Sequence, residues 1–249
     1  MHFSPNSTKR KALPYVVVGG GVVAAAAIVG GFLAIPAVSG STGAVASTTE
    51  EVAVVTERPA LGAARDPLSQ DELSYALHLA TTDPALPENI TSVDGSEAPQ
   101  VLSVDVTTRD VDASDRFVDV VLYDYTSNRT FMQAVNLTAA TVSGSSREGV
   151  QPPPSADEVD YAFRVFLADA TASAGVRAEY TSVAGGELSS IDQLGVSGGA
   201  FSPDASTVGG DVCQVDRCVE MQFRVPGGGY LDTSSFVVDL SNRTVIGIQ

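Results

Sequence analysis

One uncharged run near the N-terminus constrains the fold of this 249-residue chain more than any other feature. Residues 15–38 form 24 consecutive positions without a charge, most of them Val, Ala or Gly. A helix of this length reaches about 36 Å, enough to cross a hydrocarbon core of about 30 Å. In lipid the backbone amides must bond within the segment, so a helix is expected despite the glycines. The run therefore predicts a transmembrane helix over residues 15–38.

A basic Lys-Arg-Lys cluster at positions 9–11 directly precedes this run and sets its orientation. Such residues stay on the cytoplasmic side, so residues 1–14 are predicted to be a cytoplasmic tail and the rest to be exported. The chain is thus expected at the cell membrane with a single span and its C-terminus outside. The alternative is a secreted form, because residues 37–39 and 44–46 resemble signal-peptidase sites. The run exceeds the usual signal-peptide core of about 7–15 residues, which favours a retained signal-anchor.

Charge is distributed very unevenly along the chain. The formal net charge is −16, yet all 30 acidic residues lie beyond residue 49. The part after the uncharged run carries 11 Arg against these acids, a net charge of −19. A field of that sign repels phosphate groups, so nucleic acid is not expected as a partner. No Lys occurs after residue 11, and this bias is typical of a GC-rich bacterial genome.

Two segments of the exported part share one helix-start pattern. Residues 69–72 and 155–158 lie 86 positions apart, and both are S-x-x-E capping boxes that begin a helix. Apolar residues follow at i, i+3, i+4 and i+7 from Leu73 and from Val159, which predicts two amphipathic helices. Strand-like runs follow each helix, at 101–106, 116–125 and 130–138 after the first and at 176–183, 217–225 and 230–240 after the second.

This order of elements predicts an α+β fold of two tandem units, in each of which a helix covers an antiparallel sheet. The second unit holds 17 more residues, because the spacing of 86 positions grows to 103 at the ends of the units. We expect them in the Gly/Ser-rich stretch 185–210, as a loop or an extra hairpin. The expected domains are a flexible stalk, a first unit and a second unit, over 39–65, 66–149 and 150–249. The tetrapeptide Ser-Asn-Arg-Thr recurs at 127–130 and 241–244, at positions that are not equivalent in the units, and is interpreted as a coincidence.

Several short motifs occur in a fixed order along the exported part. They are Asp-Pro-Leu-Ser-Gln-Asp-Glu at 66–72, an arginine-led strand at 116–125, Val-Asn-Leu at 135–137 and a Gln-Pro linker at 151–154. In this order they resemble the small N-terminal domains of copper amine oxidases, which have a cystatin-like fold, across residues 66–249. The catalytic domain of that family uses three copper-binding histidines and a quinone made from tyrosine, whereas this chain ends at Gln249. The resemblance therefore implies two cystatin-like units without the enzymatic activity.

The exported part offers few groups suited to catalysis. His2 is expected in the cytoplasm, and His78 at a solvated position of the first helix whose counterpart is Arg164. One exported histidine supports neither a Ser-His-Asp or Cys-His mechanism nor a zinc or copper centre. Cys213 and Cys218 lack C-x-x-C spacing and face an oxidising compartment, so they are expected to form a structural disulfide. No catalytic, cofactor-binding or metal-binding residue is predicted.

The expected function follows from this combination of an anchor, an acidic exported part and missing catalytic groups. We expect a non-enzymatic interaction or accessory protein, held to the membrane by its N-terminal helix, that binds another protein or the cell envelope. The alternative is a binding site for a small ligand in a groove between helix and sheet. A polar-lined cavity would favour the ligand, and an exposed apolar patch the protein partner.

Overall fold

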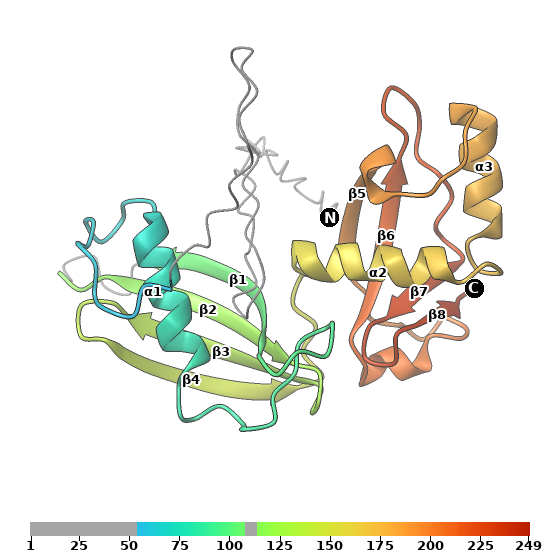
Figure 1. Ribbon diagram of the computed structural model, residues 1–249. Coiled ribbons are helices and arrows are strands. Elements are labelled where there is room, and N and C mark those ends of the chain that lie inside the picture. The colour runs from blue at the N-terminus through green and yellow to red at the C-terminus, as the bar shows by residue number, and fades with distance from the viewer. Residues whose placement is uncertain (1–53, 108–113) are drawn as a thin grey trace, which may run out of the picture.

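The computed structural model describes residues 54–107 and 114–249 (Figure 1). The expected cytoplasmic tail, transmembrane helix and cleavage sites lie outside these residues. Within the described ranges, no helix has both the length and the hydrophobicity needed to span a bilayer. The described residues have an α+β architecture with three α-helices and two four-stranded antiparallel sheets, which agrees with the fold class predicted from the sequence.

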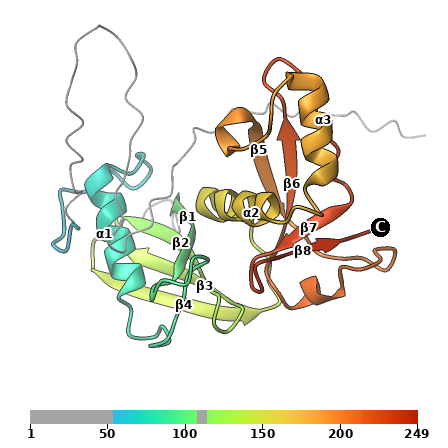
Figure 2. The ribbon, with the colours of Figure 1, turned by 45° about the vertical axis from the view of Figure 1, so that its right-hand side comes forward.

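The first sheet is a meander with one helix across one of its faces (Figure 2). Its elements in chain order are α1 (Gln70–Thr81), β1 (Gln100–Thr107), β2 (Phe117–Asp124), β3 (Arg129–Asn136) and β4 (Thr141–Glu148). The apolar stripe of α1 buries Ala76, Leu77 and Ala80 in one cluster with Val120 and Leu122 of β2. The predicted helix face and the two central strands are therefore confirmed.

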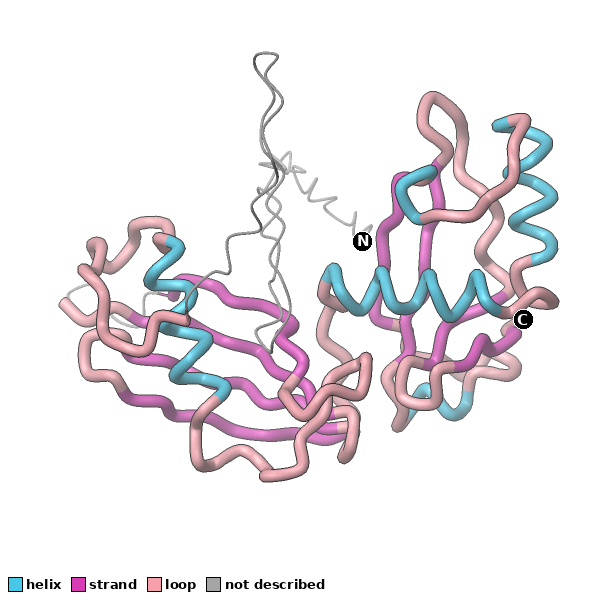
Figure 3. The backbone as a smooth tube through the Cα atoms, viewed as in Figure 1, coloured by secondary structure: helices cyan, strands magenta, loops and turns pink. Residues whose placement is uncertain are grey.

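The second sheet repeats this meander, with strands in the order β5-β6-β7-β8 (Figure 3). The elements are α2 (Ala156–Ala168), α3 (Ala174–Ala184), two 3-10 turns η1 (Ile191–Gln193) and η2 (Asp211–Gln214), β5 (Gly195–Ala200), β6 (Cys218–Arg224), β7 (Phe236–Asp239) and β8 (Thr244–Gly247). Aromatic rings from α2, β6 and β7 fill its core, with the rings of Phe166 and Phe236 stacked at a centroid distance of 4.5 Å. Such ring pairs add to the gain from apolar burial.

Both helices begin at the predicted capping boxes, which share one geometry. Ser69 Oγ accepts a hydrogen bond from Glu72 N at 3.2 Å, and Glu72 Oε2 accepts one from Ser69 N at 2.8 Å. Ser155 and Glu158 make the same two bonds at the same distances. In each case a serine and a glutamate satisfy free N–H groups at the helix start. The glutamate of each box is also buried, which the box by itself does not require.

Each unit is built around one buried ion pair between this glutamate and an arginine in front of a central strand. Arg116 Nε and Nη2 donate to the two carboxylate oxygens of Glu72 at 2.6 and 3.1 Å. Arg217 Nε and Nη2 donate to those of Glu158, both at 2.9 Å. All four side chains are at most 2% exposed. The bidentate geometry fixes the helix start against the strand start in both units.

The guanidinium groups also bind the chain in front of each helix. Arg116 donates to the carbonyl oxygens of Ala63 and Pro67, and Arg217 to that of Pro152 at 2.7 Å. These bonds use further donors of the fork, so each guanidinium nitrogen has a partner. Each pair thus connects the helix start, the chain directly before it and an arginine 44 or 59 residues away in sequence.

The segment 176–183, predicted as a strand, is helical and forms most of α3. Its β-branched residues suggested a strand, but Val176 and Tyr180 lie four positions apart and are both buried, which is helical periodicity. The helix ends at Gly185, whose φ of 72° is the left-handed conformation that favours glycine at a helix C-terminus. Tertiary packing here overrides a weak local preference.

The stretch 185–210, predicted as a loop or an extra hairpin, contains the edge strand β5, which pairs with the arginine-led strand β6 as β1 pairs with β2. Because half of the residues in β5 are glycines, the strand shows no alternation of apolar and polar side chains in the sequence. A Cβ atom at Gly198 would lie 2.6 Å from Cγ2 of Val159, so α2 can pack on this strand only where a side chain is missing. Strand β4 was also not predicted, because nearly all of its side chains are exposed and polar.

Residues 54–65, assigned to the stalk from composition, lie against the first unit. Val55 N donates to Ser74 Oγ at 3.1 Å, and Gly62 N donates to Glu72 Oε1 at 2.9 Å. The side chains of Val55 and Leu61 pack on the apolar cluster under α1. This part of the predicted stalk is therefore ordered, since it completes the hydrogen bonding of a buried carboxylate.

We predict that Glu72→Gln destabilises the first unit by about 3–5 kcal/mol, because it leaves the buried Arg116 charge without a counter-ion. Urea unfolding of the full chain in detergent would measure the change. The matched control is Glu148→Gln, which removes the exposed ion pair between Glu148 and Arg129 and should cost less than about 1 kcal/mol. Equal effects of the two substitutions would contradict a central role for the buried pair.

Candidate functional site

The most distinctive polar cluster in the described residues lies where the two units meet. The turn between β2 and β3 reaches the start of α2, and Tyr125 Oη donates to Glu158 Oε1 at 2.5 Å. Burial, and then the adjacent Glu158 carboxylate, raise the pKa of Tyr125 far above its ordinary value, so the hydroxyl keeps its proton and remains a donor. The first unit thereby supplies a hydrogen bond to the buried ion pair of the second.

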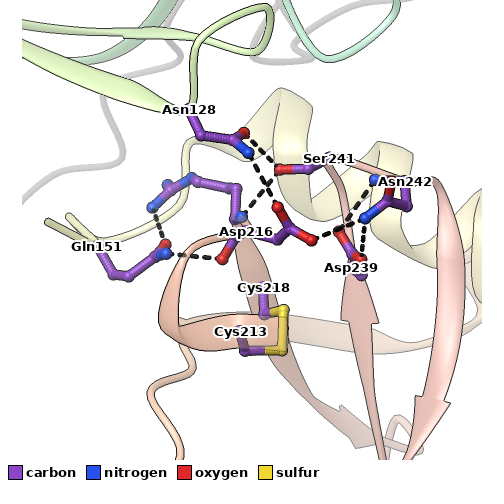
Figure 4. The surroundings of a disulfide bond; sticks show 9 residues. Asn128, Gln151, Cys213, Asp216, Cys218, Asp239, Ser241 and Asn242 are labelled. Atoms are coloured by element: carbon purple, nitrogen blue, oxygen red, sulfur yellow. Dashed lines mark hydrogen bonds between the residues drawn. A yellow bond between two sulfur atoms is a disulfide. The ribbon is translucent and has the colours of Figure 1, made fainter. Parts of the chain in front are cut away.

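The recurring Ser-Asn-Arg-Thr tetrapeptides meet at this junction (Figure 4). Asn128 Nδ2 donates to Asp216 Oδ1 at 2.9 Å, and Asn242 Nδ2 donates to Asp216 Oδ2 at 2.8 Å. Ser241 Oγ donates to Asn128 Oδ1 at 2.7 Å. The tetrapeptides lie in non-equivalent turns, as the sequence predicted, but their asparagines share one carboxylate. Asn128 has a φ of 51°, a conformation that asparagine tolerates better than most residues.

Aromatic contacts surround these hydrogen bonds. The guanidinium carbon of Arg217 lies 5.2 Å from the ring centroid of Tyr123, a cation–π distance. The rings of Tyr123 and Tyr125 meet edge to face at 4.9 Å. Both tyrosines come from the first unit, and the arginine comes from the second. The junction therefore excludes water from a charged group by stacking it on an aromatic face.

The predicted disulfide closes the loop that carries Asp216 and Arg217. Cys213 and Cys218 are bonded with their Cα atoms 5.5 Å apart, and both are almost completely buried. The bond itself is confirmed. Its position beside the junction was not predicted, because spacing alone does not show what the enclosed residues contact.

A cleft of about 260 Å³ opens beside this junction and lies between the units. Its apolar wall comes mainly from the first unit, from Leu77, Val93, Ala98, Pro99 and Val101. Its polar wall comes mainly from α2, which contributes Asp157, Asp160, Tyr161 and Arg164, with Asp94 from the first unit opposite. A cleft between two packed units is a common location for binding sites.

The cleft carries excess negative charge. Burial, followed by the carboxylates of Asp160, Glu158 and Asp94, raises the pKa of Asp157. Hydrogen bonds from Ser92 and Ser96 lower the pKa of Asp94, so that group stays ionised. Arg164 pairs with Asp160 at 2.9 Å. A cation entering the cleft would therefore stabilise carboxylates that now repel one another.

His78, the histidine predicted to be solvated, is partly exposed on α1, while His2 lies outside the described residues. Among the described residues, no group of three or more His, Cys, Asp or Glu side chains is arranged to hold a metal ion. No protein-family model matches the chain, and no curated protein matches it either. The resemblance to copper amine oxidase N-terminal domains therefore stays a prediction.

The ion pairs and the junction were not identified from the sequence. A signal for the ion pairs exists, because each capping-box glutamate is followed in its unit by an arginine directly before a strand, at Arg116 and Arg217. Duplicated charges of opposite sign could have suggested a contact. For the junction, the repeated Ser-Asn-Arg-Thr tetrapeptide was a signal, because it supplies both Asn128 and Asn242. It was interpreted as a coincidence, since nothing in the sequence connects it to Asp216.

We predict that Asp157→Asn raises the melting temperature of the full chain at pH 7 by a few degrees. A carboxyl whose pKa is raised on folding favours the folded state below its unfolded pKa and opposes folding once the pH exceeds its folded pKa. The gain should therefore shrink as the pH falls towards 4. Asp71 occupies the same second helical position in α1 but is exposed, so Asp71→Asn should give no gain. A loss of stability in Asp157→Asn would contradict this account of the cleft.

Proposed function

We propose that this protein is a single-pass, membrane-anchored interaction protein with a non-catalytic ectodomain outside the cell. Residues 15–38 serve as the anchor, and the acidic remainder faces outward. The observation that carries the proposal is the junction, where partly buried contacts of Tyr125 and Asn128 connect the two α+β units. Two units joined in this way present a continuous surface to a partner, which suits recognition.

The proposed fold of each unit is cystatin-like, in line with the motifs that resemble copper amine oxidase N-terminal domains. One helix on a four-stranded antiparallel meander is consistent with that layout. The partner is a protein or cell-envelope component with a positively charged contact surface, because the exported part has a net charge of −19. Fold alone carries no activity, and the proposal assigns none.

The test places a photo-crosslinking amino acid at the exposed Asp94 on the rim of the cleft, in intact cells whose ectodomain is removable by added protease. We expect a discrete adduct with one protein or envelope polymer, because the rim is part of the recognition surface. The control site is Val183, 54% exposed on α3. The same adducts at both positions, or protection of the ectodomain from external protease, would contradict the proposal.

A second candidate function is the binding of a small cation in the cleft. It is favoured by the combination of an apolar wall at Leu77 and Val101 with the carboxylates of Asp94, Asp157 and Asp160. That combination suits a ligand with one ammonium group and one apolar body. A cleft of about 260 Å³ admits only a small molecule or a single side chain.

The probe for this candidate is 2-phenylethylamine, titrated calorimetrically into the full chain in detergent. We expect saturable binding that weakens at least tenfold in Asp157→Asn, a factor that corresponds to the loss of one charge-assisted contact. The neutral alcohol of the same shape and the Asp71→Asn variant are the controls. Equal affinity for amine and alcohol would exclude a cation site.

A further inference from the structure

The loop closed by the disulfide reaches more parts of the molecule than its six residues suggest. It spans residues 213–218, from Cys213 inside η2 to Cys218 at the first position of β6. Gln214 and Val215 at its tip are exposed, whereas Arg217 is buried and Asp216 is partly so. The loop thus directs two charged side chains inward, toward the junction, and two residues outward.

Contacts of this loop with the first unit come from both charged side chains. Asp216 Oδ1 accepts from Asn128 Nδ2 at 2.9 Å. The Arg217 guanidinium stacks on Tyr123 with 5.2 Å between its carbon and the ring centroid. Both partners belong to the turn between β2 and β3 or to the strand end before it. The loop therefore contacts the tip of the first unit, together with Glu158 and Ser241.

The same loop holds the linker between the units. Gln151 Nε2 donates to the carbonyl oxygen of Asp216 at 2.8 Å, and Arg217 Nη1 donates to that of Pro152 at 2.7 Å. Just before the linker, Gly149 has a φ of 66°, so the chain turns there in a conformation that favours glycine. A linker fixed at this turn fixes the direction in which the second unit leaves the first.

The two halves of the loop are held differently: Asp216 and Arg217 make side-chain bonds to both units, whereas residues 213–215 depend on local backbone bonds and on the disulfide. The backbone N–H groups of Cys213, Val215 and Asp216 donate to the carbonyl oxygens of Gly210 and Val212, at the start of η2. Without the disulfide, the exposed residues Gln214 and Val215 would sample more conformations. The hydrogen bond between Asp216 and Asn128 would then form in a smaller fraction of them. A covalent closure of five residues' separation removes most of that freedom.

We infer that the Cys213–Cys218 disulfide is a positioning element of the contact between the two units, rather than only a local brace of the second. It acts through Asp216 and Arg217, which the closed loop presents to Asn128 and Tyr123 of the first unit. The inference depends on these contacts and on neither the membrane anchor nor the partner proposed above.

Hydrogen-exchange mass spectrometry on the full chain in detergent tests the inference, using the double variant Cys213→Ala with Cys218→Ala. The amides to follow are Tyr125 N and Thr126 N in the first unit and Ser155 N at the start of α2, each hydrogen-bonded at or beside the junction. We expect about tenfold faster exchange at all three, as for the loss of one hydrogen bond to a charged group. Acceleration confined to residues 211–218 would overturn the inference.

Two further variants separate positioning from general loss of stability. Asn128→Ala keeps the disulfide and should accelerate the same Ser155 amide, because it breaks the contact from the other side. Val237→Ala removes apolar packing beside the disulfide without touching the junction, and it should leave Tyr125 and Thr126 unchanged. The inference fails if Val237→Ala reproduces the pattern of the double variant. If the double variant does not fold, wild-type protein reduced by a phosphine and alkylated replaces it, with the same two outcomes.

Discussion

The buried arginine–glutamate pair is the interaction on which each unit depends. Removing two charges from water is costly, and the cost is offset only when geometry is good and every donor is used. The carboxylate oxygens of Glu72 meet this condition, because they accept hydrogen bonds from Arg116 and from the backbone N–H groups of Ser69 and Gly62. Burial tends to raise the pKa of Glu72, but hydrogen bonds from Arg116, Ser69 N and Gly62 N lower it to about 2. One carboxylate thus joins the helix start, the strand start and the chain that leads into the helix.

The two units complete this pair in different ways, and the difference couples them. In the first unit the remaining acceptor position on Glu72 is filled by the amide of Gly62, from the segment just before α1. In the second, the corresponding position on Glu158 is filled by the hydroxyl of Tyr125, from the other unit. A requirement that is met locally in one unit is met across the junction in the other. The relative placement of the units therefore follows from the same need to satisfy a buried charge.

The junction also determines the shape and charge of the cleft between the units. Because Tyr125 and Asn128 hold the tip of the first sheet at the start of α2, the acidic face of that helix stands opposite the loop that carries Asp94. The result is a cleft with an apolar wall on one side and carboxylates on both. The disulfide loop reaches the same junction through Asp216. The cleft and the contacts of the disulfide loop thus both arise from the packing of the two units.

The sequence by itself determined the features set by local patterns: the two capping boxes, the apolar stripes of α1 and α2, the alternation along β6 and the pairing of the only two cysteines. Each depends on residues within one element or one short loop, where period and spacing are visible. Only the tertiary structure decided that 176–183 is a helix and that a glycine-rich stretch forms β5. It also decided that Glu72 and Glu158 are buried in ion pairs with arginines. It also brought Asn128 and Asn242 to Asp216. These features depend on neighbours distant in sequence, because burial and close approach select the conformation there, and a single chain's pattern does not record which surfaces will meet.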